Sequence, residues 1–270
     1  MPLDSYISDS EGTRPQESEQ FRVFSADNGH RNVFQDISTI VVFGDSMSKF
    51  DACTPWLKQF LVLVNNARDA GSRKLQAYNY ACPGSTAEDD LKDQMEEFFD
   101  RFPKNTKPGD KPPLDPDQTL YVLWLGTNDC GGLFGDVEEI VGILFDDGLD
   151  ELYTWSKARN FLLIDVPPVG RSPSASESIS IPERCSNWNR LLKERAKSYV
   201  RENEHTSISV FSVHHVISDI LDNPAEFGFE DVDVAMEGGG IWLDSLHFTS
   251  GVHSIIARRL KKALDAIDSI

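Results

Sequence analysis

Three short polar motifs in this sequence carry residue types that together can perform nucleophilic catalysis. Ser46 follows the apolar run 38–43, and the glycine two residues before it permits a turn at the end of a buried strand. Asn128 lies in a Gly-Thr-Asn-Asp motif, and Asp244 precedes His247 by three residues. In that order the motifs offer a nucleophile, a donor for an oxyanion, and a base with its orienting acid.

Alternating strand-like and helix-like segments are expected to position these motifs. Short apolar or β-branched runs bounded by turn residues predict strands at 39–43, 76–81, 119–125, 160–166 and 207–212. Alternation of strands with helices is typical of a parallel sheet covered on both faces. We therefore expect one α/β domain, in which the carboxyl ends of the strands meet along one edge of the sheet.

Three helices have recognisable start signals. Thr54 and Pro55 predict an N-cap and a first helical residue, and Gly71 is expected to end that helix. The capping box 85–88 precedes an apolar helical face at residues 91, 95, 98, 99 and 102. Thr249 is expected to cap a last helix with its apolar face inward, formed by Val252, Ile255, Ile256 and Leu260.

Ser46, Gly84 and Asn128 follow the first three predicted strands, at the edge where ligands bind in open α/β sheets. Gly84 stands before a predicted helix N-terminus, whose amide groups favour developing negative charge. The Asn128 side chain can donate an N–H to the same oxygen. Each residue also has an ordinary structural interpretation as part of a turn, but their convergence at one edge favours catalysis.

The carboxylate of Asp244 and the imidazole of His247 are expected on one loop before the last predicted helix. Their spacing lets Asp244 hold one ring nitrogen while the other faces Ser46. The structural alternative is an aspartate near a helix start and a half-buried histidine. Asp45 is expected to bond the backbone of its own turn. No other potential ligands cluster around the pair His214-His215, so we do not predict a metal site.

These motifs resemble the signature blocks of the SGNH, or GDSL-type, hydrolase family. Gly44-Asp45-Ser46-Met47 matches the nucleophile block, with methionine where leucine is usual. The glycine block, the G-x-N-D block and the D-x-x-H block match residues 79–84, 126–129 and 244–247. The resemblance covers residues 38 to 265 and keeps all four blocks in the family's order.

The resemblance implies a three-layer α/β/α sandwich with a central parallel sheet, the flavodoxin-like SGNH hydrolase fold. It implies hydrolysis of a carboxylic ester, without a cofactor, by Ser46, Asp244 and His247. It also implies an oxyanion hole made by the Ser46 and Gly84 N–H groups and the Asn128 side chain. The layout is most similar to plant-type GDSL lipases and to fungal acetylesterases of carbohydrate esterase family 16. That similarity suggests a short acyl group on a small-molecule or carbohydrate ester.

Two other functions stay open at this point. A lysophospholipase or thioesterase would use the same site on a lipid acyl group, and a binding module would use the scaffold without catalysis. The α/β-hydrolase plan is excluded, because the motif around Ser46 lacks the last glycine of G-x-S-x-G. Nucleotide binding has no support, since neither phosphate-binding glycine motif is present.

The length of the acyl group is predicted from the apolar residues near the predicted catalytic turns, which are Met47, Phe50, Leu133 and Phe134. A long acyl chain needs a long apolar groove, because each buried CH₂ contributes about 0.8 kcal/mol. No amphipathic lid helix follows Ser46 or Asn128 in the sequence. We therefore predict an acyl pocket suited to roughly two to four carbons.

The length of 270 residues suits one large domain. Residues 1–36 are polar and are expected to form a flexible tail, with a short ordered piece near 21–24, while 37–270 form the hydrolase domain. The proline-rich stretches 103–116 and 167–182 are expected to be surface loops, the second at the rim of the site. The sequence does not indicate an oligomeric state.

Charge and targeting signals limit the partners. Lys and Arg number 26 and Asp and Glu number 44, a formal net charge of −18 that repels nucleic acid and anionic lipid. No apolar run approaches the roughly 20 residues of a membrane span. Without a visible signal peptide or glycosylation sequon, we expect a cytoplasmic protein with four reduced cysteines. A misannotated N-terminus would instead allow secretion.

Overall fold

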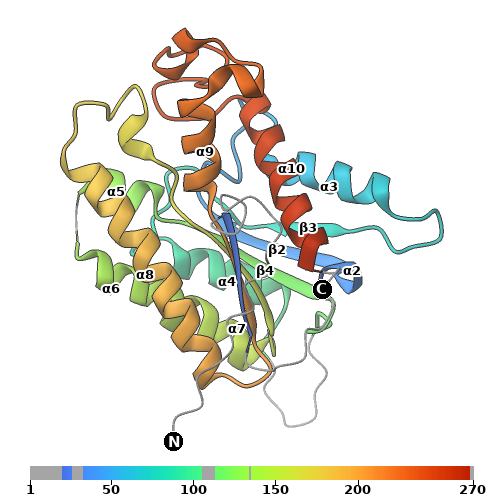
Figure 1. The fold of residues 1–270 in the computed structure, drawn as a ribbon. Helices are drawn as coiled ribbons and strands as arrows, with labels where there is room; N and C mark the ends of the chain where they lie inside the picture. Colours follow the sequence, from blue (N-terminus) through green and yellow to red (C-terminus); the bar gives the residue numbers. More distant parts are fainter. Residues whose placement is uncertain (1–19, 26–32, 105–112, 134, 268–270) are drawn as a thin grey trace, which may run out of the picture.

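The apolar runs of the sequence form a six-stranded central sheet in the computed structural model (Figure 1). The structure describes residues 20–25, 33–104, 113–133 and 135–267. The strand order is β1-β6-β5-β4-β2-β3, and neighbours pair in parallel except β1, which runs antiparallel to β6. The strands are Phe21–Ser25 (β1), Thr39–Gly44 (β2), Gln76–Asn79 (β3), Thr119–Trp124 (β4), Asn160–Ile164 (β5) and Ser207–Phe211 (β6).

The strand order reverses around β2. After β2 the chain forms β3 on one side of it and then crosses back to form β4 on the other side. Ligands of doubly wound sheets bind at such a reversal, outside the carboxyl ends of the strands. Ser46 follows β2 and Asn128 follows β4, so the topology brings two of the predicted site residues to this reversal.

Helices cover both faces of the sheet (Figure 1). One face carries α3 (Trp56–Ala67), α9 (Val213–Asp222) and α10 (Ser250–Ile267). The other carries α4 (Leu91–Arg101), α6 (Val137–Ile143), a π-helical segment (Leu144–Leu149), α7 (Asp150–Trp155) and α8 (Ser180–Glu202). The shorter elements are α2 (Val33–Asp36), α5 (Thr127–Gly132) and 3₁₀ turns at Val169–Arg171, Pro224–Phe227 and Asp231–Val234. The predicted α/β fold with helices on both faces of the sheet is confirmed.

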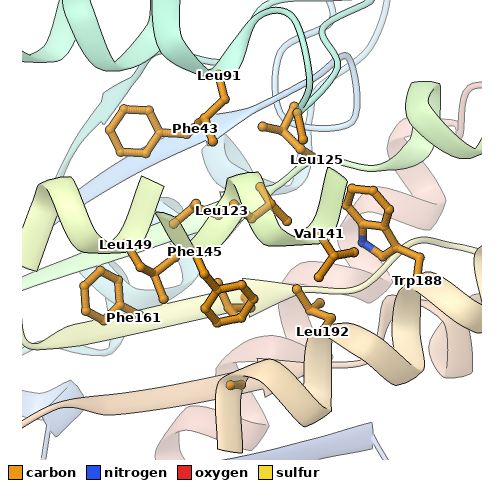
Figure 2. Packing of buried hydrophobic residues seen from close by; sticks show 14 of the residues in the cluster. Phe43, Leu91, Leu123, Leu125, Val141, Phe145, Leu149, Phe161, Trp188 and Leu192 are labelled. Carbon is orange, nitrogen blue, oxygen red and sulfur yellow. The ribbon is translucent and has the colours of Figure 1, made fainter. Parts of the chain in front are cut away.

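Both faces of the central strands are buried. In β4, Tyr121 and Leu123 pack under α4 and α8, while Val122 and Trp124 pack under α3 and α10. Figure 2 shows Leu123 within the first of these two layers, among side chains from the covering helices. A strand buried on both faces needs apolar residues at every position, which is why these strands are continuous apolar runs.

The first strand lies inside the segment that the sequence analysis assigned to a tail. Phe21–Ser25 forms β1 near the short ordered piece expected at 21–24, and Phe21 pairs opposite Phe211 of β6. This antiparallel edge strand was not part of the predicted parallel sheet. Residues 1–19 and 26–32 lie outside the described residues, so the domain boundary at residue 36 stays a prediction.

Two helix starts differ from the prediction. The α3 helix begins at Trp56, and Thr54 does not cap it; the Thr54 N–H donates instead to Ser250 Oγ at 2.8 Å. The capping box at 85–88 starts no helix, and α4 begins at Leu91. By contrast, Thr249 Oγ1 accepts the Val252 N–H at 3.4 Å, so the predicted cap of α10 is confirmed. No helix in the described ranges is long and apolar enough to cross a membrane.

Candidate active site

The turn that carries Ser46 is fixed by the glycine before it. Gln94 from α4 binds both backbone groups of Gly44, accepting from its N–H at 2.9 Å and donating to its carbonyl at 2.9 Å. A Cβ at Gly44 would lie 2.9 Å from the Trp124 carbonyl oxygen, so β2 and β4 approach too closely there for a side chain. The Ser48 N–H then donates to the Asp45 carbonyl at 3.1 Å and closes the turn. Ser46 is thereby held at the carboxyl end of β2.

Asp45 supports this turn from inside the protein, in the structural position that the sequence predicted. Its Oδ1 accepts the Met47 N–H at 2.8 Å, and its side chain is fully buried. Burial raises the pKa of Asp45 to about 7, although the Met47 amide and the Thr127 hydroxyl favour the charged form. Met47 is 1% exposed and packs in the core under α3 and α10. The prediction that Met47 lies beside the acyl group is therefore wrong.

Ser46, His247 and Asp244 are hydrogen bonded in series. Ser46 Oγ lies 2.9 Å from His247 Nε2, and His247 Nδ1 lies 2.8 Å from Asp244 Oδ2. The other carboxylate oxygen, Oδ1, accepts the N–H groups of Leu246 at 2.8 Å and His247 at 2.7 Å. Burial opposes the charge, but these bonds and the imidazole outweigh it and lower the pKa of Asp244. An ionised Asp244 therefore orients the imidazole toward Ser46.

The loop after β3 meets the loop after β4 through Asn128. Asn128 Nδ2 donates to the Ser85 carbonyl at 2.8 Å, which uses one of its two amide hydrogens and leaves the second for another acceptor. Gly84 is exposed with φ of +85°, a left-handed conformation that suits glycine. The structure thus places the Asn128 side chain against the backbone of the residue that follows Gly84.

Asp129 fastens these two loops together, a role that the sequence analysis did not assign. Its carboxylate accepts the Ala87 N–H at 2.9 Å and 3.1 Å and the Glu88 N–H at 3.4 Å. Burial raises the pKa of Asp129 to about 6 against the effect of these bonds. The same bonds explain why the capping box at 85–88 starts no helix, since the amides there are turned toward Asp129.

Two further polar residues hold the nucleophile turn and were also missed. Asn79 Nδ2 donates to the Ser48 carbonyl at 3.0 Å, while Gln94 binds Gly44 as described above. Gln94 lies on the buried face of α4 beside Leu91 and Met95. A glutamine on an otherwise apolar helical face was the sequence signal for this contact, because a buried amide needs partners.

Three features around the site bear on substrate binding. The Phe50 ring stacks on the His247 imidazole with centroids 4.1 Å apart and planes 16° apart. Leu133 is 49% exposed with φ of +60°, while Phe134 lies outside the described residues. The Ser174 N–H donates to the Ser245 carbonyl at 2.9 Å, so the proline-rich loop 167–182 contacts the Asp244–His247 loop.

Other candidate binding features lie elsewhere in the fold. A cavity of about 1040 Å³ opens beside Ser38, Gln118 and Asn160, at the amino ends of the strands and therefore opposite Ser46. Within the described ranges, no three His, Cys, Asp or Glu side chains are grouped to hold a metal ion. The hydrogen-bonded series at the strand ends, rather than cavity size, therefore identifies the candidate site.

A serine hydrogen bonded to a histidine, which is bonded in turn to an aspartate, is the arrangement of a serine hydrolase, and here it lies at the carboxyl edge of a mostly parallel sheet. The sequence model of the GDSL-like Lipase/Acylhydrolase family matches residues 40–260, and the chain belongs to this family. As members named esterase and lipase indicate, the protein is a carboxylic ester hydrolase.

Individual relatives agree with this assignment. An acetylesterase of Thermothelomyces thermophilus is 25% identical over 69% of this chain and 68% of its own length. A GDSL esterase/lipase of Arabidopsis thaliana is 30% identical over 36% of this chain and 29% of its own length. Among solved structures, Axe2, an acetylxylan esterase of Geobacillus stearothermophilus, superposes with a TM-score of 0.56. It is 13% identical, covers 84% of this chain and 94% of its own, and therefore supports the fold alone.

Proposed function

We propose that this protein hydrolyses short-chain acyl esters of the acetyl type through an acyl-enzyme on Ser46. The observation that carries the proposal is the bonded series from Ser46 through His247 to Asp244. In this mechanism His247 Nε2 takes the Ser46 proton as Oγ attacks the ester carbonyl, while Asp244 holds Nδ1–H. His247 then protonates the leaving alcohol, and a water molecule releases the acyl group by the same steps in reverse.

The negative charge of the tetrahedral intermediate falls on the former carbonyl oxygen. The Ser46 and Gly84 N–H groups and the second amide hydrogen of Asn128 are the proposed donors to this oxygen. Asn128 is suited to the role because its bond to Ser85 already fixes the amide plane, so no reorganisation is needed during the reaction. Asp129 holds the Gly84 loop in place through its bonds to Ala87 and Glu88.

A short acyl group is proposed because few apolar side chains remain for a long one. Met47 packs in the core, and one face of the Phe50 ring is covered by the His247 imidazole. Of the four apolar residues that were expected near the substrate, Leu133 has an exposed side chain. The acetylesterase name of the Thermothelomyces thermophilus relative points the same way.

A series of p-nitrophenyl esters from acetate to palmitate at one pH tests this proposal. We expect kcat/KM to be highest for roughly two to four carbons and to fall for longer chains, because added CH₂ groups find no apolar surface to bury. Ser46→Ala is expected to abolish most of this hydrolysis, and a serine-reactive phosphonate is expected to label Ser46. Preference for octanoate or longer would overturn the short-chain proposal in favour of a lysophospholipase-like or thioesterase-like enzyme. Absence of any hydrolysis would favour a binding module.

A further inference from the structure

The two hydrogen bonds of His247 leave one motion of its ring weakly restrained. Asp244 bonds Nδ1 and Ser46 bonds Nε2, so both contacts lie close to one axis through the ring. Swinging the ring out of its own plane changes either distance little at first, but it turns the Nε2 lone pair, which lies in that plane, away from Oγ. Hydrogen bonds weaken as their angle departs from linear, so proton transfer needs a further contact against the ring face.

Phe50 supplies a contact of this kind. Its ring lies nearly parallel to the imidazole, with planes 16° apart and centroids 4.1 Å apart. Carbon atoms in contact are about 3.5–4.0 Å apart, so this stack leaves no space for the imidazole to tilt toward Phe50. The backbone that carries the imidazole is fixed as well, since the His247 carbonyl accepts the Leu243 N–H at 2.8 Å.

Phe50 comes from the segment that carries the nucleophile, not from the histidine loop. The Lys49 N–H donates to the Asp45 carbonyl at 3.3 Å, and the Ser48 carbonyl accepts from Asn79 at 3.0 Å. These bonds anchor the backbone just before Phe50 to the ends of β2 and β3. The Phe50 ring therefore holds the imidazole at a fixed position relative to Ser46, although 201 residues separate Ser46 from His247.

We infer that Phe50 is a positioning residue for the reaction, one that holds the His247 imidazole at the tilt required for proton transfer with Ser46. This inference rests on the proposed function. When the imidazole takes the serine proton it becomes a cation, and a cation over an aromatic face is stabilised by the ring quadrupole. Phe50 thus favours the transition state over the ground state, and it acts on proton transfer rather than on the acyl chain.

The test compares Phe50→Leu, which keeps an apolar side chain without a flat face, with Phe50→Tyr, which keeps the ring. Aromatic stacking is worth about 0.5–1.5 kcal/mol, so Phe50→Leu is expected to lower kcat by about 2–13-fold. We expect the same factor for p-nitrophenyl acetate and butyrate, with KM within about twofold. Labelling of Ser46 by diethyl p-nitrophenyl phosphate is expected to slow by a similar factor. Phe50→Tyr is expected to restore all three rates to within about twofold of the parent.

Phe99→Leu is the matched control, because Phe99 is a half-buried ring on α4 that contacts the Phe98 ring in the core cluster under α4 and α8. Its kcat is expected to match the parent. A second check uses the Asp244→Asn background, in which the imidazole is no longer oriented. There Phe50→Leu is expected to have less than about a twofold effect, because two residues that orient one ring are not additive.

Several outcomes would overturn the inference. A KM effect that grows from acetate to butyrate would make Phe50 a wall of the acyl pocket. An unchanged labelling rate in Phe50→Leu, or no recovery in a folded Phe50→Tyr, would exclude the positioning role. Failure of the proposed function would give a different result. The parent protein would then not hydrolyse the esters, and Ser46→Ala would be labelled as much as the parent.

Discussion

The buried carboxylate of Asp45, next to the proposed nucleophile, makes stability depend on pH in a way that one substitution can remove. Burial raises its pKa from 3.8 to about 7, and the negative charge of Asp129 adds to the rise. The folded state therefore binds the Asp45 proton more tightly than the unfolded chain does. The stability from this proton is fully present below pH 3.8 and is lost as the pH rises through about 7. At about 1.36 kcal/mol per unit, the complete loss is about 4 kcal/mol.

Asp45→Asn removes this loss and keeps the shape of the side chain. The amide oxygen can still accept the Met47 N–H, which Asp45 Oδ1 accepts at 2.8 Å. The amide nitrogen supplies donors for an acceptor nearby, such as the Thr127 side chain, which interacts with the Asp45 side chain. Most of the loss falls between pH 5 and pH 8, so we expect the stability of Asp45→Asn relative to the parent to improve by about 2–3 kcal/mol over that range.

Urea unfolding of parent and variant at pH 5 and pH 8 measures this difference. Asp129 and Asp165 also have raised pKa values because of burial, so both proteins lose stability as the pH rises. The difference between the two proteins at each pH cancels the part due to Asp165, while the coupling to Asp129 belongs to the measured effect of the Asp45 charge. If the difference in unfolding free energy between Asp45→Asn and the parent were the same at pH 5 and at pH 8, the reasoning would be refuted. It would mean that the bonds from Met47 and Thr127 outweigh the cost of burying the charge.

Three further predictions concern the site and the core. Asn128→Ala is expected to lower kcat by about 10²–10³ with little change in KM, and steady-state kinetics that show only a KM effect would assign Asn128 to substrate binding. Gly126→Ala is expected to destabilise the protein by more than about 2 kcal/mol in urea unfolding, because φ is +115° and a Cβ would lie 2.4 Å from Trp188; a neutral result would contradict this backbone. Thiol titration is expected to count four free cysteines in denatured, unreduced protein and to find the exposed Cys82 most reactive in the native state, and two disulfides would contradict the reduced state.

The central strands and their order along the chain were predictable because each is buried on both faces. The predicted runs 39–43 and 160–166 match β2 and β5 within two residues, since a continuous apolar run marks such a strand without any long-range information. The edge strand β1 was not assigned to the sheet. Arg22 and Val23 are exposed, so the segment resembles the polar tail around it, and its pairing with β6 depends on residues far along the chain.

Local signals failed where a distant side chain competed with them. The capping box at 85–88 fits the pattern of a helix start, yet the carboxylate of Asp129 takes the amides of Ala87 and Glu88 from 42 and 41 residues away. Met47 was expected beside the substrate because it follows Ser46 directly. The turn instead points it into the core, since successive side chains in a tight turn take different directions.

The sequence by itself determined which residues are present for catalysis, their order, and the strands whose ends carry them. It identified Ser46, Gly84, Asn128, Asp244 and His247 as candidates, because turn motifs after apolar strands can be recognised locally. Only the tertiary structure decided how these groups meet. The 2.9 Å contact between Ser46 and His247, the bond from Asn128 to the Ser85 carbonyl and the stacking of Phe50 on His247 all join segments distant in sequence. Such contacts follow from side-chain direction and packing across the whole sheet, which no short stretch of sequence specifies.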